Sequence, residues 1–482
     1  MTISDAEFKA WLQVGKTQYR NILVEANCNA AGSETTIKLS QRAYNEYLAC
    51  LKGGLNYSES LTVDGQFSLN LGDLEIINTA GRFDYVLDYI WANRRILVLL
   101  GDVRWPRADY RIVLDGTIIK LDSKDNQTLN IQIADKLQRL NAPLTETKLG
   151  GTTENKDSII PFSLGECCNV TPLLIDPLTH TYQVHPGPIE DIPEVRADEF
   201  PISISKNLSA GQFTTTYAPI GAVTCTVQGH KHSGAYSNKI GDLCYQIAVD
   251  GGKPETRFTD ADCDLTQLIA FNTAHPQPVG YFNNSQDNQL TCMQGLAASV
   301  GAQVAISRSG LMRIYTLEAS SPVQTITAVD MKENTLQISQ TLEIAGSVKL
   351  GFCKNWTPQA RNKSIQIPAK HQDLWATEWR TVTRQNATVI ASHKLHSVPQ
   401  QEDTYLLVEA DAIAEADRRL AFRSTQKRIY QFVGLSSCLL LELGQSVTLK
   451  HKRFGLESGQ NGVIVSLSFD WFNYSVTVGV LI

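Results

Sequence analysis

Residues 110–133 read YRIVLDGTIIKLDSKDNQTLNIQI, and this stretch indicates a chain built mainly from β-strands. Apolar and polar residues alternate on both sides of Asp115-Gly116, which is the two-residue period of a half-buried strand. An Asp-Gly pair flanked by such alternation is a strong hairpin signal. We therefore predict a hairpin that turns at Asp115-Gly116, followed by a further strand over residues 128–133.

Helical patterns are fewer. Apolar residues over 83–90 repeat at helical spacing just after the chain-breaking Gly81, which predicts a helix there. Residues 404–424 are rich in alanine and carry charges at helical spacing, so we predict a helix that Thr404 caps. Residues 213–250 return to a β-like alternation.

The composition excludes several classes of protein. Of the 482 residues, 43% are hydrophobic and 19% are charged, which suffices for sizeable cores and excludes a mainly disordered chain. The net charge of -6 argues against general binding of nucleic acid or anionic membranes. No window approaches 18 apolar residues and the first residues lack a signal-peptide pattern, so we expect neither a transmembrane helix nor secretion. Ten cysteines are too few for a disulfide scaffold, and we expect free thiols in a reducing cytoplasm.

The chain divides along its length into four predicted parts. These are an N-terminal β-barrel domain over 1–160, a proline-rich connector over 161–212, a middle α+β domain over 213–340, and a C-terminal helix with a second β-barrel domain over 341–482. The expected fold class is thus mainly β (α+β) and multidomain, with two related small β-barrel modules and mixed α/β insert domains.

A weak internal repeat favours two related modules. Residues 100–103 (LGDV) are followed by a glycine-led strand at 116–119 (GTII), and residues 443–447 (LGQSV) are followed by another at 462–465 (GVIV). Each pattern continues through a turn into a third strand. Chance is the alternative explanation, because short strand patterns recur in any all-β protein.

Common catalytic and cofactor motifs are missing from the sequence. The nucleophile elbow G-x-S-x-G, the phosphate loop, the metalloprotease motif H-E-x-x-H, a strand-linked G-x-G-x-x-G and any C-x-x-C pair are all absent. We therefore assign no catalytic, cofactor-binding or metal-ligating residue, and predict a protein that is not an enzyme and has no cofactor.

The sequence GHKHSG at 229–234 places His230 and His232 on the same side of an extended chain. Such a pair can chelate zinc or iron, and in a trimer six imidazoles could converge on one ion. Two ligands are too few for a structural site within one chain. We therefore predict an exposed, glycine-flanked loop, with the metal site as the alternative.

Cysteines, acidic residues and tryptophans give weaker hypotheses. Four thiolates could in principle hold an iron–sulfur cluster, but their wide spacing favours buried free thiols. Two adjacent cysteines cannot easily bridge to each other, so we expect two inert thiols on opposite faces. The alternating carboxylates of residues 259–264 lack the rest of a calcium loop, which favours a turn or helix start. Three tryptophans could line a sugar site or pack in a core. The residues concerned are Cys225, Cys244, Cys263, Cys292, Cys167, Cys168, Trp356, Trp375 and Trp379.

Several stretches resemble one known family. They are RRILVLLGDVRWPRADY at 94–110, Asp115-Gly116, ADKL at 134–137, IPFSLGE at 160–166, NVTPLLID at 169–176, YQVH at 182–185, GPI at 187–189, and the C-terminal pattern from Leu443-Gly444 through Gly455-Leu456 to 459–471. Together they resemble the tail-tip or baseplate hub proteins of bacteriophages with long non-contractile tails.

The resemblance implies a structural virion protein. It implies a homotrimeric ring at the distal end of the tail that joins the tail tube to the tip, with two related β-barrel domains per subunit and a path for DNA ejection. The implied partners are distal tail and tail-tube proteins, tail fibre or central tip proteins, and passing viral DNA; the implied location is the virion tail tip after assembly in the host cytoplasm. The alternative is a carbohydrate-binding or carbohydrate-cleaving tail component.

Overall fold

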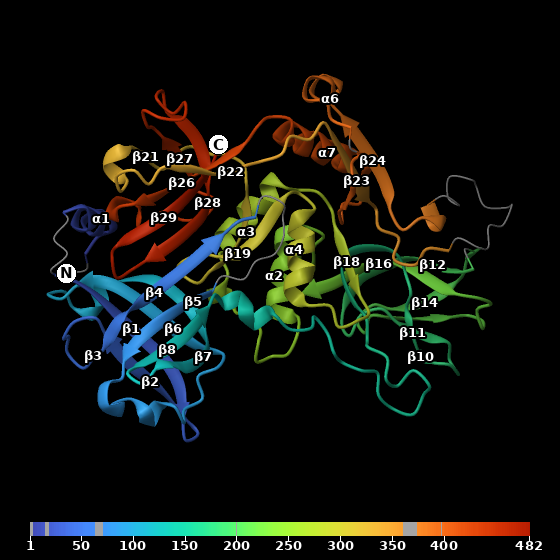
Figure 1. Cartoon of the computed structure of the whole chain (residues 1–482). Coiled ribbons are helices and arrows are strands. Elements are labelled where there is room, and N and C mark those ends of the chain that lie inside the picture. Colours follow the sequence, from blue (N-terminus) through green and yellow to red (C-terminus); the bar gives the residue numbers. More distant parts are fainter. Residues whose placement is uncertain (1–2, 15–18, 63–70, 199, 360–373, 397) are drawn as a thin grey trace. The chain divides into compact units, whose positions relative to one another are not determined.

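The computed structural model describes residues 3–14, 19–62, 71–198, 200–359, 374–396 and 398–482. The chain forms two compact units, each assembled from segments that are distant in sequence (Figure 1). The first unit comprises Met1–Arg139, Ala305–Leu342 and Lys427–Ile482, and the second comprises Leu140–Val304 and Glu343–Gln426. Strands predominate, so the prediction of a mainly β, multidomain chain is confirmed. The four consecutive domains stay a prediction.

The first unit is built around one sheet. Its elements are α1 (Asp5–Gln13), β1 (Arg20–Ala30), β2 (Ser33–Ser40), β3 (Leu48–Ala49), β4 (Leu51–Ser60), β5 (Leu71–Ile77), η2 (Thr79–Gly81), η3 (Asp84–Val86), β6 (Arg94–Asp102), η4 (Arg107–Asp109), β7 (Arg111–Asp125), β8 (Thr128–Ala134), β20 (Met312–Thr316), β21 (Thr325–Ile326), η7 (Ala328–Asp330), β22 (Gln337–Thr341), β26 (Arg428–Gly434), η8 (Ser436–Cys438), β27 (Ser446–Leu449), β28 (Gln460–Asp470) and β29 (Ser475–Leu481). Two further elements, η5 (Lys136–Leu140) and β19 (Ala302–Ile306), cross the borders between the units.

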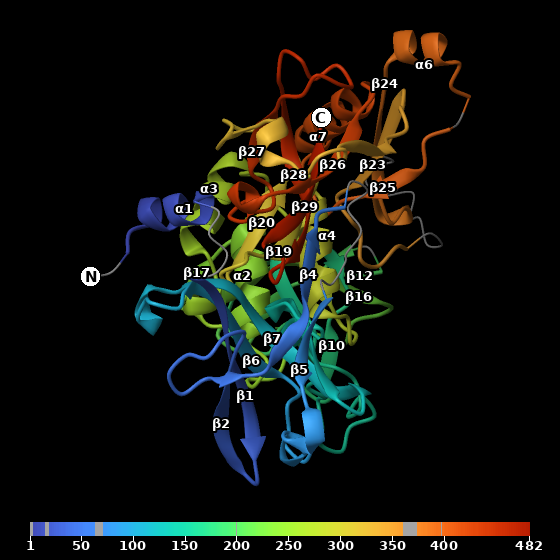
Figure 2. The same ribbon diagram turned by 60° about the vertical axis from the view of Figure 1, so that its left-hand side comes forward.

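The sheet of the first unit has 14 strands, in the order β22-β26-β29-β28-β4-β5-β8-β7-β6-β1-β2-β3, with β27 on β28 and β21 on β27. Figures 1 and 2 show β4 of the N-terminal part beside β28 of the C-terminal part. Strand β4 pairs with β5 on one edge and with β28 on the other. Neither edge of β4 is therefore open to pair with another strand of the N-terminal module, which closure into a barrel through β4 would require. The expected closed barrels are therefore not formed by the described strands; two modules share one open sheet instead.

The two modules contain the same three-stranded meander. Strands β6, β7 and β8 pair antiparallel in chain order, as do β27, β28 and β29. In each, the long middle strand pairs first with the strand before it and then with the strand after it. Residues 95–133 and 444–480 thus share a meander of three antiparallel strands, as the sequence repeat indicates, but within one sheet and not as separate barrels.

Gly116 and Gly462 occupy equivalent places in the two meanders. Each stands where the middle strand changes partners, and a Cβ built on each would lie 2.7 Å from the carbonyl oxygen of Ala134 and 2.6 Å from that of Leu481, respectively. Ala134 ends β8 and Leu481 ends β29, so the two carbonyls are equivalent as well. Only glycine lets the backbones approach this closely.

The predicted hairpin turn at Asp115-Gly116 is wrong, because β7 runs through it as a continuous 15-residue strand. The pair marks a bend inside the strand, where Gly116 makes room for the Ala134 carbonyl. Asp115 is buried and its carboxylate accepts hydrogen bonds from Arg95 at 2.9 and 2.8 Å, with Lys136 Nζ 3.0 Å away. An Asp-Gly pair forms a turn when both residues are solvated, and here neither is.

The helix predicted over residues 83–90 is also absent as such: the chain makes the 3-10 turns η2 and η3 there. Ala80 and Gly81 have positive φ, and the Asn78 side chain accepts a hydrogen bond from the Phe83 amide at 2.7 Å. Phe83 and Val86 are nevertheless buried. The apolar spacing therefore predicted which side chains are buried but not the type of helix.

The second unit contains three sheets and several helices. Its elements are β9 (Phe162–Val170), β10 (Leu173–Asp176), β11 (Thr181–Gln183), β12 (Ile189–Ala197), β13 (Phe200–Pro201), β14 (Ile204–Asn207), β15 (Gln212–Thr215), β16 (Val223–His232), β17 (Ala235–Tyr236), α2 (Ile240–Asp250), η6 (Asp260–Asp262), α3 (Leu265–Ala274), β18 (Gly280–Asn283), α4 (Gln289–Ala298), β23 (Ser347–Phe352), β24 (Arg380–Gln385), α6 (Ala387–His393), β25 (Gln401–Asp403) and α7 (Glu409–Arg423). The sheet that concerns the site has the order β13-β12-β16-β9-β18, with β17 on β16.

Two helices of this unit bear on the predictions. The β-like alternation expected up to residue 250 is wrong beyond β17, because α2 covers Ile240–Asp250. Its buried apolar residues, such as Ile240, Leu243, Cys244 and Ile247, follow helical spacing. Helix α7 confirms the helix predicted within 404–424, but it begins at Glu409 rather than near Thr404. The Thr404 hydroxyl instead donates to the Gly351 carbonyl at 2.7 Å.

Candidate functional site

The seam between the two modules of the first unit is the first candidate. Here β4 and β28 pair antiparallel, with Glu59 opposite Leu467. Glu59 is 2% exposed, and burial raises the pKa of its carboxyl to about 8, although the charge of Arg308 acts in the opposite direction. The carboxyl is therefore protonated at neutral pH and can donate a hydrogen bond.

Arg308 stabilises the C-terminal side of this seam. Its guanidinium donates to the Leu439 carbonyl at 2.7 Å and lies 3.5 Å from a Glu442 carboxylate oxygen. Arg313 contacts the other Glu442 oxygen at 3.0 Å. These bonds orient polar groups within the seam, where the pairing of β4 with β28 joins the two modules.

The second candidate is a side-chain cluster in the second unit, built on β16 and α2. His230 and His232 lie at the C-terminal end of β16 and point to the same side of the strand. Lys231, between them, points to the other side and forms an ion pair with Glu190 at 2.7 Å. Asp250, the last residue of α2, accepts on one carboxylate oxygen from His230 Nε2 at 2.8 Å and from His232 Nδ1 at 2.7 Å. The exposed loop predicted for the two histidines is thus wrong: both are half-buried on a strand.

His185 extends the cluster into the protein. This side chain is 1% exposed, and burial holds its pKa well below the usual value, so the ring is neutral. Its Nδ1 accepts from the Ser163 amide at 3.2 Å, which leaves the proton on Nε2, 3.0 Å from His230 Nδ1. His230 consequently carries its own proton on Nε2, facing Asp250.

The charge on Asp250 follows from these contacts. Burial acts to raise the pKa of Asp250, but the hydrogen bonds from His230 and His232 outweigh it and lower the pKa. Asp250 is therefore a carboxylate that accepts two N–H groups on one oxygen. In the part of the chain that the structure describes, His230, His232 and Asp250 are the one trio of His, Cys, Asp or Glu ligand atoms within 4.8 Å of one another.

The cysteines weighed as a cluster lie in separate parts of the unit. Cys225 on β16 packs in one core cluster with Cys167 on β9, whereas Cys244 lies on α2 and Cys292 on α4. Burial raises the pKa of all of these thiols, that of Cys292 to about 12. Thiols that stay protonated are poor metal ligands, which agrees with the expectation of inert buried cysteines.

Cys168 has a thiol partner that the sequence did not reveal. Cys167 and Cys168 point to opposite faces, as expected, and the Cys168 thiol lies close to that of Cys353. The contact between the two thiols raises the pKa of Cys168 and lowers the pKa of Cys353. Cys353 lies 185 positions away and follows β23, so no local pattern could have linked the two.

The carboxylates of residues 259–264 hold the local backbone rather than an ion. Asp262 forms a capping box with Thr259, and Asp264 accepts from the Gln267 amide at 3.1 Å as the N-cap of α3. Asp260 accepts from the Tyr245 hydroxyl at 2.5 Å. The expected helix start is confirmed.

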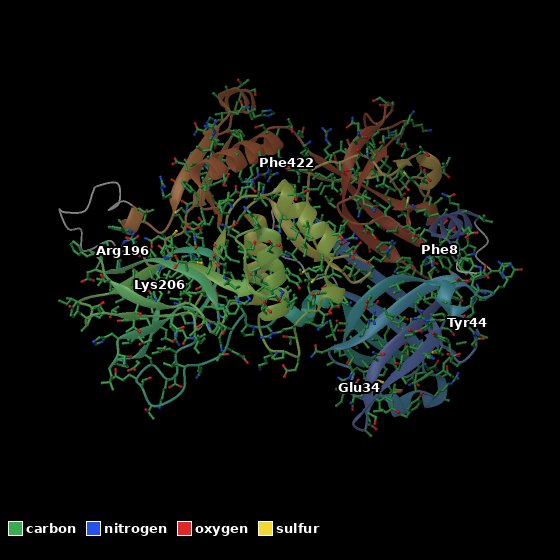
Figure 3. All side chains as sticks on the ribbon, turned by 180° about the vertical axis from the view of Figure 1, so that it is seen from behind. Phe8, Glu34, Tyr44, Arg196, Lys206 and Phe422 are labelled. Carbon is green, nitrogen blue, oxygen red and sulfur yellow. The ribbon has the colours of Figure 1, made fainter. Side chains whose placement is uncertain are left out.

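The tryptophans are covered by cations of the chain itself. Lys354 Nζ lies 3.9 Å from the ring centroid of Trp356 and 5.2 Å from that of Trp379. Arg196, labelled in Figure 3, lies 4.7 Å from the centroid of Trp375. A cation near a ring face reduces the aromatic surface on which a sugar could stack, so these contacts do not favour a saccharide site.

Comparison with known proteins finds distant similarity to solved tail proteins. No protein-family model and no curated protein sequence matches the chain. The tail protein from Neisseria meningitidis MC58 is 9% identical, over 96% of this chain and 97% of its own, with a TM-score of 0.41. Prophage tail protein gp18 from Listeria monocytogenes EGD-e is 9% identical over 96% and 94%, with a TM-score of 0.44, and the 43 kDa tail protein of prophage MuSo2 from Shewanella oneidensis is 10% identical over 96% and 96%, with a TM-score of 0.39.

None of the helices in the described ranges combines the length and the apolar character needed to cross a membrane.

Proposed function

We propose that the chain is a structural subunit of a bacteriophage tail, and that it acts as the hub at the tail tip. In this role three chains form a ring that joins the tail tube to the tip and leaves a central path for DNA. The observation that carries the proposal is the duplicated meander, with Gly116 and Gly462 at equivalent positions, joined by β4 and β28 into one unit.

Symmetry explains why a duplicated module suits a hub. Closed rings of identical subunits are the usual form of a soluble oligomer. A trimer of chains with two similar modules presents six similar surfaces, which allows a threefold ring to match a sixfold tube. The sequence resemblance to tail-tip proteins supports the same arrangement.

The expected partners follow from this role: two further copies of the chain, distal tail and tail-tube proteins, and fibre or central tip proteins. We expect polar and acidic groups along the central path, because acidic walls repel phosphate and let DNA pass without binding. The proposed activity is structural and not enzymatic. A carbohydrate-binding role is not proposed, since Lys354 and Arg196 each occupy one face of a tryptophan that would serve it.

Mass measurement of the full chain tests the proposal. Sedimentation equilibrium is run with the chain alone and with the tail-tube protein of the same phage. A trimer, either alone or only with the tube protein, is the expected result. A chain that remains monomeric in both samples, or that releases sugars from host envelope material, would overturn the proposal.

A further inference from the structure

The cluster on β16 and α2 has no part in joining the two modules, yet it brings three ligand-type side chains together. We propose that His230, His232 and Asp250 form a site for one divalent transition-metal ion per chain, and that zinc suits it best. The ligand atoms are His230 Nε2, His232 Nδ1 and an Asp250 carboxylate oxygen, which lie within 4.8 Å of one another.

The ligand chemistry selects the ion. Imidazole nitrogen suits zinc and its neighbours, whereas magnesium and calcium prefer oxygen ligands only. Two imidazoles, one carboxylate and a water complete the four ligands of a tetrahedral zinc site. His232 and Asp250 are about one-third exposed, at 31% and 28% of their side-chain surface, so solvent can supply the fourth ligand.

The geometry needs only a small adjustment. In a tetrahedral site with zinc–ligand distances of about 2.0–2.1 Å, neighbouring ligand atoms stand about 3.3 Å apart. The two histidine nitrogens lie 2.8 and 2.7 Å from the Asp250 oxygen, so the carboxylate must withdraw by roughly half an ångström for an ion to enter. Asp250 also ends α2, and the carbonyls at a helix C-terminus favour a positive charge.

His185 opposes binding and sets its strength. As long as Ser163 donates to His185 Nδ1, His185 directs an N–H at His230 Nδ1 and keeps the His230 proton on the nitrogen that must bind the ion. Metal binding requires that proton to leave Nε2 and the His185–His230 contact to rearrange. Misplaced partners of this kind lower metal affinity by about 10–100-fold, which weakens the site without removing its three ligands.

The ion would fasten the end of β16 to the end of α2. A ligand that binds the folded state alone raises its stability by mass action, so zinc should raise the thermal midpoint of the second unit. The site lies within one chain and does not depend on the hub role. It also differs in stoichiometry from six histidines around a trimer axis: one ion per chain against one ion per three chains.

Calorimetric titration of zinc chloride into EDTA-stripped, tag-free chain tests the proposal. We expect one ion per chain, a raised thermal midpoint with zinc, and no response to magnesium. Asp250→Asn and His232→Ala should each weaken binding by at least about 10-fold and abolish the zinc-dependent rise, since each removes a ligand. His393→Ala, which removes an exposed histidine at the end of α6, is the matched control and should bind as the parent chain does.

Thermal midpoints in EDTA show whether each variant folds. His232→Ala serves if Asp250→Asn fails to fold, because the His232 side chain is 31% exposed. Absence of saturable zinc binding, or binding that both variants retain, would overturn the proposal. One ion per three chains would also overturn it and would move the ion to a trimer axis.

Discussion

Glu59 provides the sharpest test of the seam between the two β modules. Replacing it with glutamine keeps the shape of a protonated carboxyl but removes the proton that it can lose. The Glu59 side chain is 2% exposed on β4, and burial raises its pKa from 4.5 to about 8. Unfolding returns the carboxyl to water, where it has its ordinary pKa.

The sign of the pH dependence follows from proton counting. Between pH 4.5 and about 8, the folded chain holds the Glu59 proton and the unfolded chain has released it. Stability therefore falls as pH rises through this window, and the contribution is constant above about pH 8. The full difference between the two pKa values corresponds to about 5 kcal/mol, an upper limit that relaxation of the seam reduces.

Glu59→Gln should thus match the parent chain near pH 4.5 and exceed it by several kcal/mol near pH 8 (up to about 5 kcal/mol). Guanidinium unfolding at pH 5, 6, 7 and 8 measures the difference. Glu46→Gln, at an exposed carboxylate paired with Lys38, is the control and should change the profile little. Parallel profiles for the parent chain and Glu59→Gln would refute the assignment of a neutral, buried carboxyl.

Two further predictions concern packing and a buried ion pair. Gly116→Ala and Gly462→Ala each place a Cβ under 3.0 Å from a backbone carbonyl, so each should lower the free energy of unfolding by about 1–3 kcal/mol in denaturant. The control Gly187→Ala has nothing within 4 Å of the new Cβ and should lie within about 0.5 kcal/mol of the parent. Equal losses of stability at all three positions would contradict the close approach. Arg419→Ala should cost about 3 kcal/mol in the same assay, because Arg419 donates at 2.6 Å to Glu415, which is 7% exposed, and also to Glu402; a neutral result would mean that solvent reaches the pair.

The local pattern of apolar and polar residues predicted the positions of strands well and their ends poorly. Alternation identified β7 and β8, and helical spacing with high propensity identified α7, because both depend on which face of an element is buried. It failed at Asp115-Gly116, because an Asp-Gly pair is compatible both with a solvent-exposed hairpin turn and with the bend that β7 makes beside the Ala134 carbonyl. It failed at α2, where the prediction extended the alternation of β16 over residues whose apolar positions have helical spacing, among them Ile240, Leu243, Cys244 and Ile247.

The candidate site was half visible in the sequence. The spacing of His230 and His232 placed them on one face, and the strand β16 confirms that. No sequence pattern linked Asp250 or His185 to these histidines. Asp250 is the last residue of α2, and His185 lies 45 positions before His230, ahead of β12. When ligands come from separate helices and strands, tertiary packing decides whether they meet, and the spacing of residues along the sequence does not predict that packing.

The sequence alone determined that the chain is mainly β, that it carries two similar strand patterns, and that each pattern has a glycine at the same place. Only the tertiary structure decided that β4 pairs with β28, some four hundred residues further along, and that Asp250 meets two histidines. The physical reason is that alternation fixes which face of a strand is buried, while the partner on each edge is chosen by hydrogen bonding and burial across the whole unit.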